Sequence, residues 1–201
     1  MDSRPRDASA ASLHAGPALS AKILVAGGFG VGKTTMVGAL SEVPLLATEA
    51  LMTEASVDVD QLGHTPAKTT TTVAMDFGRL TIDPQLVLYL FGAPGQSRFW
   101  FMWDDLARGA LGAVVLADTR RLADCFPALD YFESRGDLPY LLAVNRFEGQ
   151  LTHPLEEVRD ALDLPDYVPL VHCDARDRME GRTVLRELIG HALKSLADSE
   201  P

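Results

Sequence analysis

One stretch of this sequence has the residue types and spacing that hold phosphate groups, namely Gly27-Gly28-Phe29-Gly30-Val31-Gly32-Lys33-Thr34. It matches the P-loop pattern G-x-x-x-x-G-K-[ST]. The glycines allow the backbone to curl, so that successive amides point inward at a phosphate. In this pattern Lys33 reaches the terminal phosphates and the Thr34 hydroxyl binds magnesium. We expect Thr35, the next residue, to bind the nucleotide too. The stretch therefore predicts a site for nucleotide phosphates and Mg²⁺.

The segments on either side of this motif supply the context that it needs. The apolar run 22–26 predicts a buried strand, and 35–40 predicts the first turns of a helix. The amino end of such a helix adds a favourable dipole for an anion. A glycine-rich turn beside a core strand is the alternative interpretation, and the flanking strand and helix disfavour it.

Polar residues also follow two later strand-like runs. The first group is Asn145-Arg146-Phe147-Glu148, in which Asn145 could brace the P-loop and touch a base. The Glu148 carboxylate could accept hydrogen bonds from N1 and N2 of guanine, a donor pair that adenine lacks. The second group is Cys173-Asp174-Ala175-Arg176, where a backbone amide could meet the guanine carbonyl. These groups predict a guanine nucleotide as the ligand.

Alternating strand-like and helical runs occupy most of the chain. We expect strands near 22–26, 72–80, 85–91, 111–117, 140–144 and 168–171, and helices near 35–40, 97–108, 122–134, 154–162 and 181–196. The turn at 81–84 favours an antiparallel hairpin. We expect 44–72 to be a long loop, with a short helix near 49–54. The alternation predicts an α/β fold whose strand-end loops meet at one sheet edge.

Composition narrows the class of protein. The 201 residues suit one domain, expected at 21–197 behind a flexible tail at 1–20. The net charge of −10 argues against nucleic acid and anionic membranes as partners. Cys125 and Cys173 form no C-x-x-C pair, so we expect buried thiols and a cytoplasmic protein. Asp2 and the cysteine-free carboxyl end predict no direct membrane anchor.

From Lys22 to Leu196 the chain resembles the small Ras-like GTPases, whose five motifs it matches in order. The runs 68–78 and 91–100 are similar to those of the bacterial MglA-like branch, and closest to the GTPase of actinobacterial conservon operons. The resemblance implies a three-layer fold with a six-stranded, mostly parallel sheet, one antiparallel edge strand and helices on both faces. It also implies a GTP/GDP switch with slow hydrolysis. A Roadblock/longin-type protein and other conservon components, through which it could reach a membrane, are the implied partners.

The same resemblance assigns further roles. Gln96 follows Gly95 at the position of the water-orienting glutamine, and a surface glutamine on a turn is the alternative. Thr72 is implied as the second magnesium ligand, with the register open among residues 69–72. The alternative for this threonine run is simple β propensity. Neither Arg79 nor Arg98 is clearly placed to stabilise transition-state charge, so a partner is expected to stimulate hydrolysis.

Three positions depart from the family pattern. Gly92 stands where these GTPases usually carry the aspartate that orders magnesium-bound water, although MglA-like proteins lack it too. Glu148 replaces the shorter guanine-reading aspartate, and Arg146 stands where lysine is common. Gly92 motivates a second hypothesis, a nucleotide-binding scaffold with negligible hydrolysis. A small P-loop kinase is a third, and the sequence shows no arginine-rich lid for it.

Overall fold

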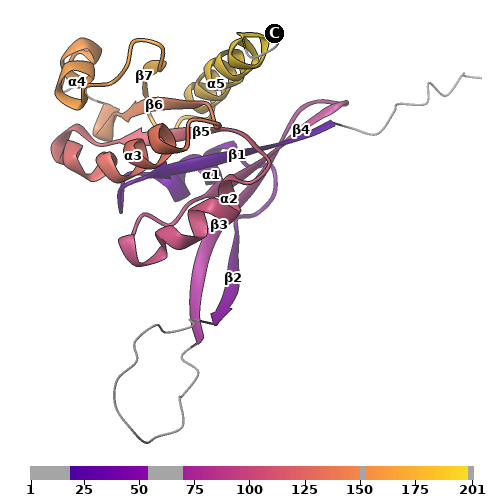
Figure 1. Cartoon of the computed structure of the whole chain (residues 1–201). Helices are drawn as coiled ribbons and strands as arrows, with labels where there is room; N and C mark the ends of the chain where they lie inside the picture. The colour runs from indigo at the N-terminus through magenta and orange to yellow at the C-terminus, as the bar shows by residue number, and fades with distance from the viewer. Residues whose placement is uncertain (1–18, 54–69, 150–152, 199–201) are drawn as a thin grey trace, which may run out of the picture.

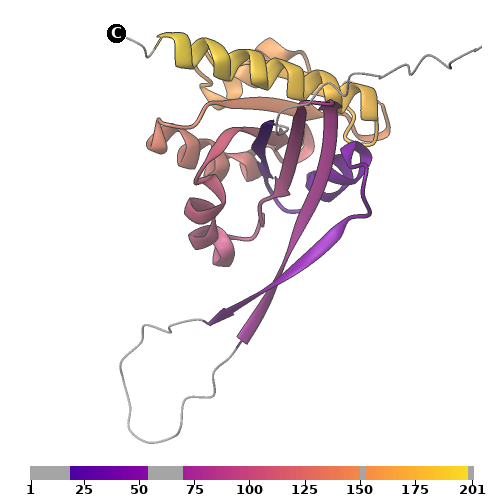
Figure 2. The same cartoon turned by 90° about the vertical axis from the view of Figure 1, so that its right-hand side faces the viewer.

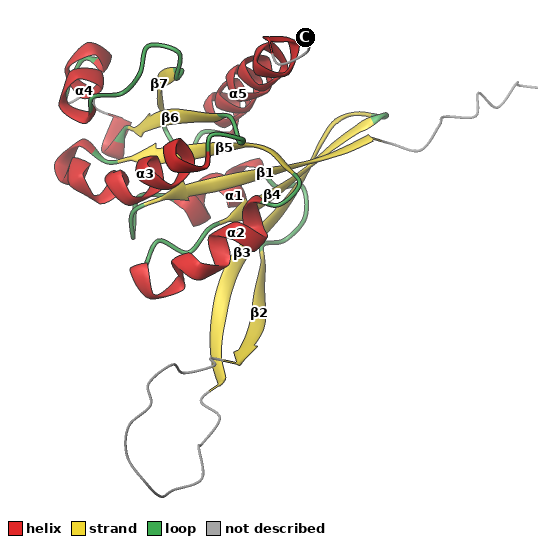
Figure 3. Ribbon diagram, viewed as in Figure 1, coloured by secondary structure: helices red, strands yellow, loops and turns green. Residues whose placement is uncertain are grey.

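The computed structural model describes residues 19–53, 70–149 and 153–198. Strands and helices alternate along most of this chain (Figure 3). The strands are β1 (Leu19–Gly27), β2 (Leu46–Thr53), β3 (Thr70–Asp83), β4 (Leu86–Gly92), β5 (Ala110–Ala117), β6 (Tyr140–Asn145) and β7 (Leu170–Cys173). The α-helices are α1 (Lys33–Leu40), α2 (Trp103–Ala107), α3 (Phe126–Arg135), α4 (Leu155–Leu162) and α5 (Arg178–Asp198). Three 3₁₀ helices are η1 (Ser97–Met102), η2 (Thr119–Cys125) and η3 (Phe147–Gly149).

The strands form one sheet in the order β2-β3-β4-β1-β5-β6-β7. Strand β1 lies between β4 and β5 and is parallel to both, and β6 and β7 continue in the same direction. Strand β3 runs antiparallel to β4, through the predicted hairpin. The expected α/β fold, with a mostly parallel sheet, one antiparallel strand and helices on both faces, is confirmed.

The segment expected to be a long loop contains an additional strand. β2 pairs antiparallel with the first half of β3, from Leu46 opposite Phe77 to Thr53 opposite Thr70. It extends the sheet to seven strands, so β3 is not the edge strand, and it replaces the short helix expected near 49–54. Figures 1 and 2 show this hairpin reaching away from the rest of the sheet. Residues 54–69 lie outside the described residues.

Each face of the sheet is covered by its own hydrophobic core. Leu24 and Ala26 of β1 point to the face covered by α2, α3 and α4, where Trp103 and Phe132 are buried. Ile23 and Val25 point to the opposite face, which α1 and α5 cover. In Figure 2, α1 and α3 lie on opposite sides of the sheet. Side chains of β1 alternate between the faces because successive residues of a strand point in opposite directions.

Several element boundaries differ from the sequence prediction, two of them because of proline. The helix expected at 122–134 begins only at Phe126, because Pro127 occupies its first turn, and a 3₁₀ segment precedes it. The strand expected at 168–171 begins at Leu170, directly after Pro169, which has no N–H to donate. Leu19 and Ser20, expected in the flexible tail, begin β1. Residues 1–18 lie outside the described part of the chain.

The aromatic run 99–103 divides between core and surface. Trp103 is buried and donates its indole N–H to the Pro94 carbonyl at 3.1 Å, whereas Phe101 is 53% exposed. Cys125 and Cys173 are both buried, as expected. Among residues 19–53, 70–149 and 153–198, no helix combines the length and the apolar character that crossing a bilayer requires.

Candidate functional site

The P-loop joins the end of β1 to α1, as the motif predicts. Its backbone takes the left-handed conformations that glycine permits, with φ of 129° at Gly27, 73° at Gly30 and 110° at Gly32. α1 begins at Lys33 without a side-chain cap at its amino end. The first amides of an uncapped helix are free to bind an anion. The local sequence therefore builds a phosphate cradle.

Lys33 turns back over this loop. Its ammonium donates to the carbonyl oxygens of Gly27 at 2.9 Å and of Gly28 at 2.6 Å. Burial lowers the pKa of Lys33 to about 8, and the nearby Asp76 carboxylate opposes that shift. The positive charge is thus held at the loop, at a cost in hydration that a bound phosphate would offset.

Asn145, at the end of β6, connects two loops of the sheet edge. Its Nδ2 donates to the Val31 carbonyl of the P-loop at 2.9 Å, and its Oδ1 accepts from the Ala175 amide at 3.0 Å. The side chain is only 7% exposed. A Cβ added to Gly32 would lie 2.7 Å from the Asn145 Nδ2, so the glycine lets these loops approach closely. The predicted bracing of the P-loop by Asn145 is present.

Beside this bridge lies a pocket of about 210 Å³. The P-loop side contributes Gly30, Gly32 and Thr35, and the strand ends contribute Asn145, Arg146, Phe147, Glu148, Asp174, Ala175 and Arg176, joined by Arg120. Glu148 is exposed and has a φ of 59°, in the left-handed region that non-glycine residues rarely adopt. The structure thus brings nearly all of the residues predicted to read the base around one pocket.

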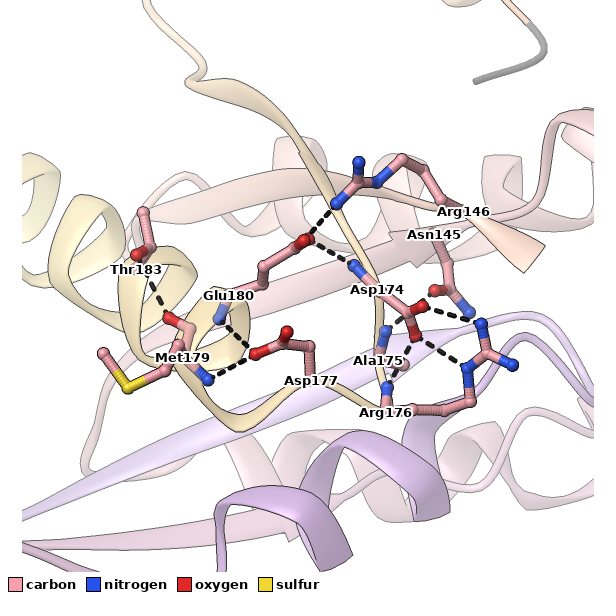
Figure 4. Close-up of polar contacts among 9 residues, drawn as sticks. All are labelled: Asn145, Arg146, Asp174, Ala175, Arg176, Asp177, Met179, Glu180 and Thr183. Atoms are coloured by element: carbon pink, nitrogen blue, oxygen red, sulfur yellow. Dashed lines mark hydrogen bonds and ion pairs between the residues drawn. The ribbon is translucent and has the colours of Figure 1, made fainter. Parts of the chain in front are cut away.

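Two arginines at this pocket are held by carboxylates (Figure 4). Arg146 is ion-paired with Glu180, whose other oxygen accepts from the Asp174 amide at 2.8 Å. Arg176 donates to Asp174 at 2.9 and 2.7 Å and holds the pKa of that carboxyl at about 2. Both guanidinium groups therefore shape the rim of the pocket while engaged in ion pairs.

The loop after β4 lies against the P-loop. A Cβ added to Gly95 would be 2.7 Å from the Lys33 Nζ and 2.9 Å from the Gly27 carbonyl oxygen. Gln96 follows at the start of η1, half-buried, with its carbonyl accepting from the Phe99 amide at 3.0 Å. Gly95 thus lies against the phosphate cradle, and Gln96 follows it in the chain.

Thr72 is not brought to Thr34. Its backbone pairs with Leu51 in the protruding part of the hairpin, four residues before Asp76. At about 3.3 Å per residue, that separation is about 13 Å along the strand. Thr70 and Thr71 lie farther out on the same strand, and Thr69 lies outside the described residues. The predicted role for Thr72 would require this hairpin to change its conformation.

Sequence reasoning missed several charged residues that support the site. Asp76 of β3 accepts a hydrogen bond from the Thr34 hydroxyl at 2.6 Å. Arg121 donates to the Phe29 carbonyl of the P-loop at 2.9 Å. Asp118, only 4% exposed, forms an ion pair with Arg120, with 2.8 Å between the Asp118 Oδ2 and the Arg120 Nη2. The Arg120 guanidinium in turn lies 3.7 Å from the centre of the Phe147 ring. Asp118 directly follows the predicted buried strand 111–117, which is the signal that could have identified it.

A family model described as "conserved hypothetical ATP binding protein" matches residues 25–195. The chain belongs to this family. A protein of Methanocaldococcus jannaschii described as uncharacterized is 33% identical to it over 100 residues. That alignment covers 50% of this chain and 52% of the relative, so the chain spans about half the length of the curated relative it matches.

Solved structures with a similar fold include G domains of FeoB iron transporters. The cytosolic domain of T. maritima FeoB has a TM-score of 0.60 at 17% identity, covering 87% of this chain and 64% of that one. The FeoB G-domain from Methanococcus jannaschii has a TM-score of 0.55 at 18% identity, covering 87% of this chain and 98% of the other. This family member therefore has the fold of P-loop G domains.

Proposed function

We propose that this protein binds guanine nucleotides and hydrolyses GTP, acting as a GTP/GDP switch. The observation that carries the proposal is the Asn145 bridge, which fixes the P-loop at Val31 and the Ala175 loop beside one pocket. The bridge would thereby hold a phosphate site and a base site at a constant separation. Such a pre-formed geometry suits a ligand with a polyphosphate at one end and a base at the other.

The cradle provides for the phosphates and for magnesium. Backbone amides of the P-loop and Lys33 would bind the phosphate oxygens. The exposed Thr34 hydroxyl, which contacts the Asp76 carboxylate, is a hard oxygen donor of the kind that Mg²⁺ prefers. In the described part of the chain no three His, Cys, Asp or Glu side chains gather into a metal site, so the Thr34 hydroxyl would act together with oxygens of the nucleotide. When bound, magnesium would offset the negative charge of the phosphates.

Glu148 would select the base. Its carboxylate at the pocket rim can accept from the N1 and N2 donors of guanine, whereas adenine would leave it without a partner. The family description names ATP, so the choice between bases decides the proposal. Calorimetric titration of nucleotide-free protein with GDP and ADP should show GDP binding at least about tenfold tighter. Preference for ADP would refute guanine recognition.

Two variants test whether GDP binds at the P-loop and at Glu148. Lys33→Ala should weaken GDP binding by tenfold or more, because a charged hydrogen bond contributes about 1.5–3 kcal/mol. Lys194→Ala, which removes an exposed lysine of α5, is the matched control. Glu148→Gln should weaken GDP by about 10- to 100-fold and leave ADP unchanged. Equal GDP affinity in wild type and Lys33→Ala would show that the P-loop lysine does not bind the nucleotide.

Gln96 would orient the attacking water beside the phosphate cradle, and no covalent intermediate is needed. Single-turnover phosphate release from GTP should fall at least tenfold in Gln96→Ala while GDP affinity is retained. Gln85→Ala, in the exposed turn before β4, is the control. Gly92 favours the alternative of a scaffold with negligible hydrolysis. Tight GTP binding without phosphate release, also in the presence of candidate partners, would establish that alternative.

The resemblance to the MglA-like and conservon GTPases extends the proposal to bacterial signalling. A Roadblock/longin-type protein would then bind the GTP-loaded form and recruit it to a membrane complex. The protruding β2–β3 hairpin starts close to the cradle. A change in its conformation on GTP binding would therefore alter a surface that a partner could bind. Co-purification with such a partner in GTP but not in GDP would support this extension, and binding that ignores the nucleotide would contradict it.

A further inference from the structure

At the end of β4, the glycine at position 92 lies beside an acidic residue of the neighbouring strand. In the register of the β3–β4 pair, Asp76 lies directly opposite Gly92. A Cβ added to Gly92 would lie 2.9 Å from both the Cβ and the Oδ2 of Asp76. Side chains at both positions would therefore collide. The Asp76 carboxylate occupies the volume that a side chain of residue 92 would need.

The same carboxylate reaches the P-loop. Its Oδ2 accepts the hydrogen bond of the Thr34 hydroxyl at 2.6 Å, a length typical of a charge-assisted O–H···O bond. Asp76 is half-buried, between the buried Gly92 and the exposed first turn of α1. A negative charge is thus fixed beside Thr34 by a residue from the neighbouring strand.

We propose that Asp76 of β3 takes the role of the aspartate that related GTPases usually carry at the position of Gly92. Its carboxylate would position Thr34 and the water around a bound magnesium ion. This inference rests on the proposed nucleotide site and adds a residue to it. Because second-shell partners of a metal ligand typically change metal affinity by about 10- to 100-fold, the effect is measurable. It also explains why glycine occupies position 92, since any larger residue would displace Asp76.

Removing the charge of Asp76 should change GDP affinity in opposite directions with and without magnesium. Without the metal, a carboxylate beside the cradle repels phosphate, so Asp76→Asn should bind GDP as tightly as wild type or more tightly in EDTA. With magnesium, the same variant should bind about 10-fold or more weakly than wild type. A purely structural role for Asp76 would weaken binding in both buffers.

The experiment measures the ratio of GDP dissociation constants in EDTA and in Mg²⁺ for four proteins. Wild type should show a large ratio and Asp76→Asn a ratio at least tenfold smaller. Asp83→Asn, the same change at the last residue of β3, should match wild type. The swap Asp76→Gly with Gly92→Asp moves the carboxylate back to β4 without the collision, and should restore the ratio at least in part.

The outcomes separate this inference from the function beneath it. If Asp76→Asn keeps the wild-type ratio within twofold, with an unchanged urea unfolding midpoint, Asp76 has no role at the metal although nucleotide binding stands. If wild type binds GDP in neither buffer, the proposed function fails and this inference fails with it. A swap variant that folds and binds GDP in EDTA but shows no recovery would also overturn the assignment.

Discussion

The Asn145 bridge offers the sharpest test of how the site is held together. Replacing Asn145 with alanine removes the donor to the Val31 carbonyl and the acceptor of the Ala175 amide. Because Asn145 is only 7% exposed, these two backbone groups lose their partners in a mostly dry environment. An unpaired buried polar group costs about 1–3 kcal/mol. We expect Asn145→Ala to lower the free energy of unfolding by about 2–4 kcal/mol in total, toward the lower end where water from the adjacent pocket reaches the freed groups.

Two further variants identify the cause. Asn145→Asp keeps the shape of the side chain and the acceptor for Ala175, but places a second acceptor against the Val31 carbonyl. It should therefore be at least as destabilising as alanine at neutral pH. Arg186→Ala, at an exposed position of α5, should change stability by less than about 0.5 kcal/mol and is the control.

Urea unfolding followed by circular dichroism measures these differences, provided that the transition is two-state. The corresponding fall in melting temperature is about 5–15 °C for a domain of this size. GDP affinity should fall as well, because the two loops are no longer held in register. If Asn145→Ala unfolds within 0.5 kcal/mol of wild type, the bridge does not stabilise the site and the reasoning is refuted.

Three other predictions follow from single residues. The pKa of Lys33, about 8, should rise when phosphate binds, so GDP affinity should change little between pH 7 and 7.5 and fall about eightfold from pH 7.5 to 9. A Lys33→Arg variant that still binds should show no such fall, and a flat wild-type profile from pH 7 to 9 would contradict the linkage. Gly190→Ala in α5, where an added Cβ meets nothing within 4 Å, should stabilise the protein by about 0.5–1 kcal/mol in urea unfolding, and a loss of stability would show an unseen contact. Burial raises the pKa of the Cys125 and Cys173 thiols to about 12, so a thiol reagent at pH 8 should react with them only in urea; rapid labelling of the folded protein would disprove their burial.

Local patterns were sufficient for much of the fold and for the main binding motifs. Hydrophobic runs bounded by turns located six of the strands, because a buried strand needs a continuous apolar sequence. The P-loop was evident from its glycines and Lys33, and Asn145 from its place after a buried strand. These features depend on neighbours in the chain, which a sequence displays directly.

Other features depend on contacts between distant segments. β2 lies in the segment 44–72, whose proline, glycine and threonine residues favoured a loop. Its pairing with β3, which local composition does not reveal, makes it a strand. The engagement of Arg146 by Glu180 joins the end of β6 to the first turn of α5. Neither residue carries a local signal for the other.

The sequence by itself determined that this protein has a phosphate cradle and a candidate base-reading carboxylate at one edge of an α/β sheet. It also showed that Gly92 lacks the usual acid. Only the tertiary structure decided which residue fills that space, because the register of β3 against β4 places Asp76 opposite Gly92 and within hydrogen-bonding distance of Thr34. Register is set by pairing and packing along the whole strand, so a carboxylate 16 positions away in the chain becomes the nearest neighbour of the site.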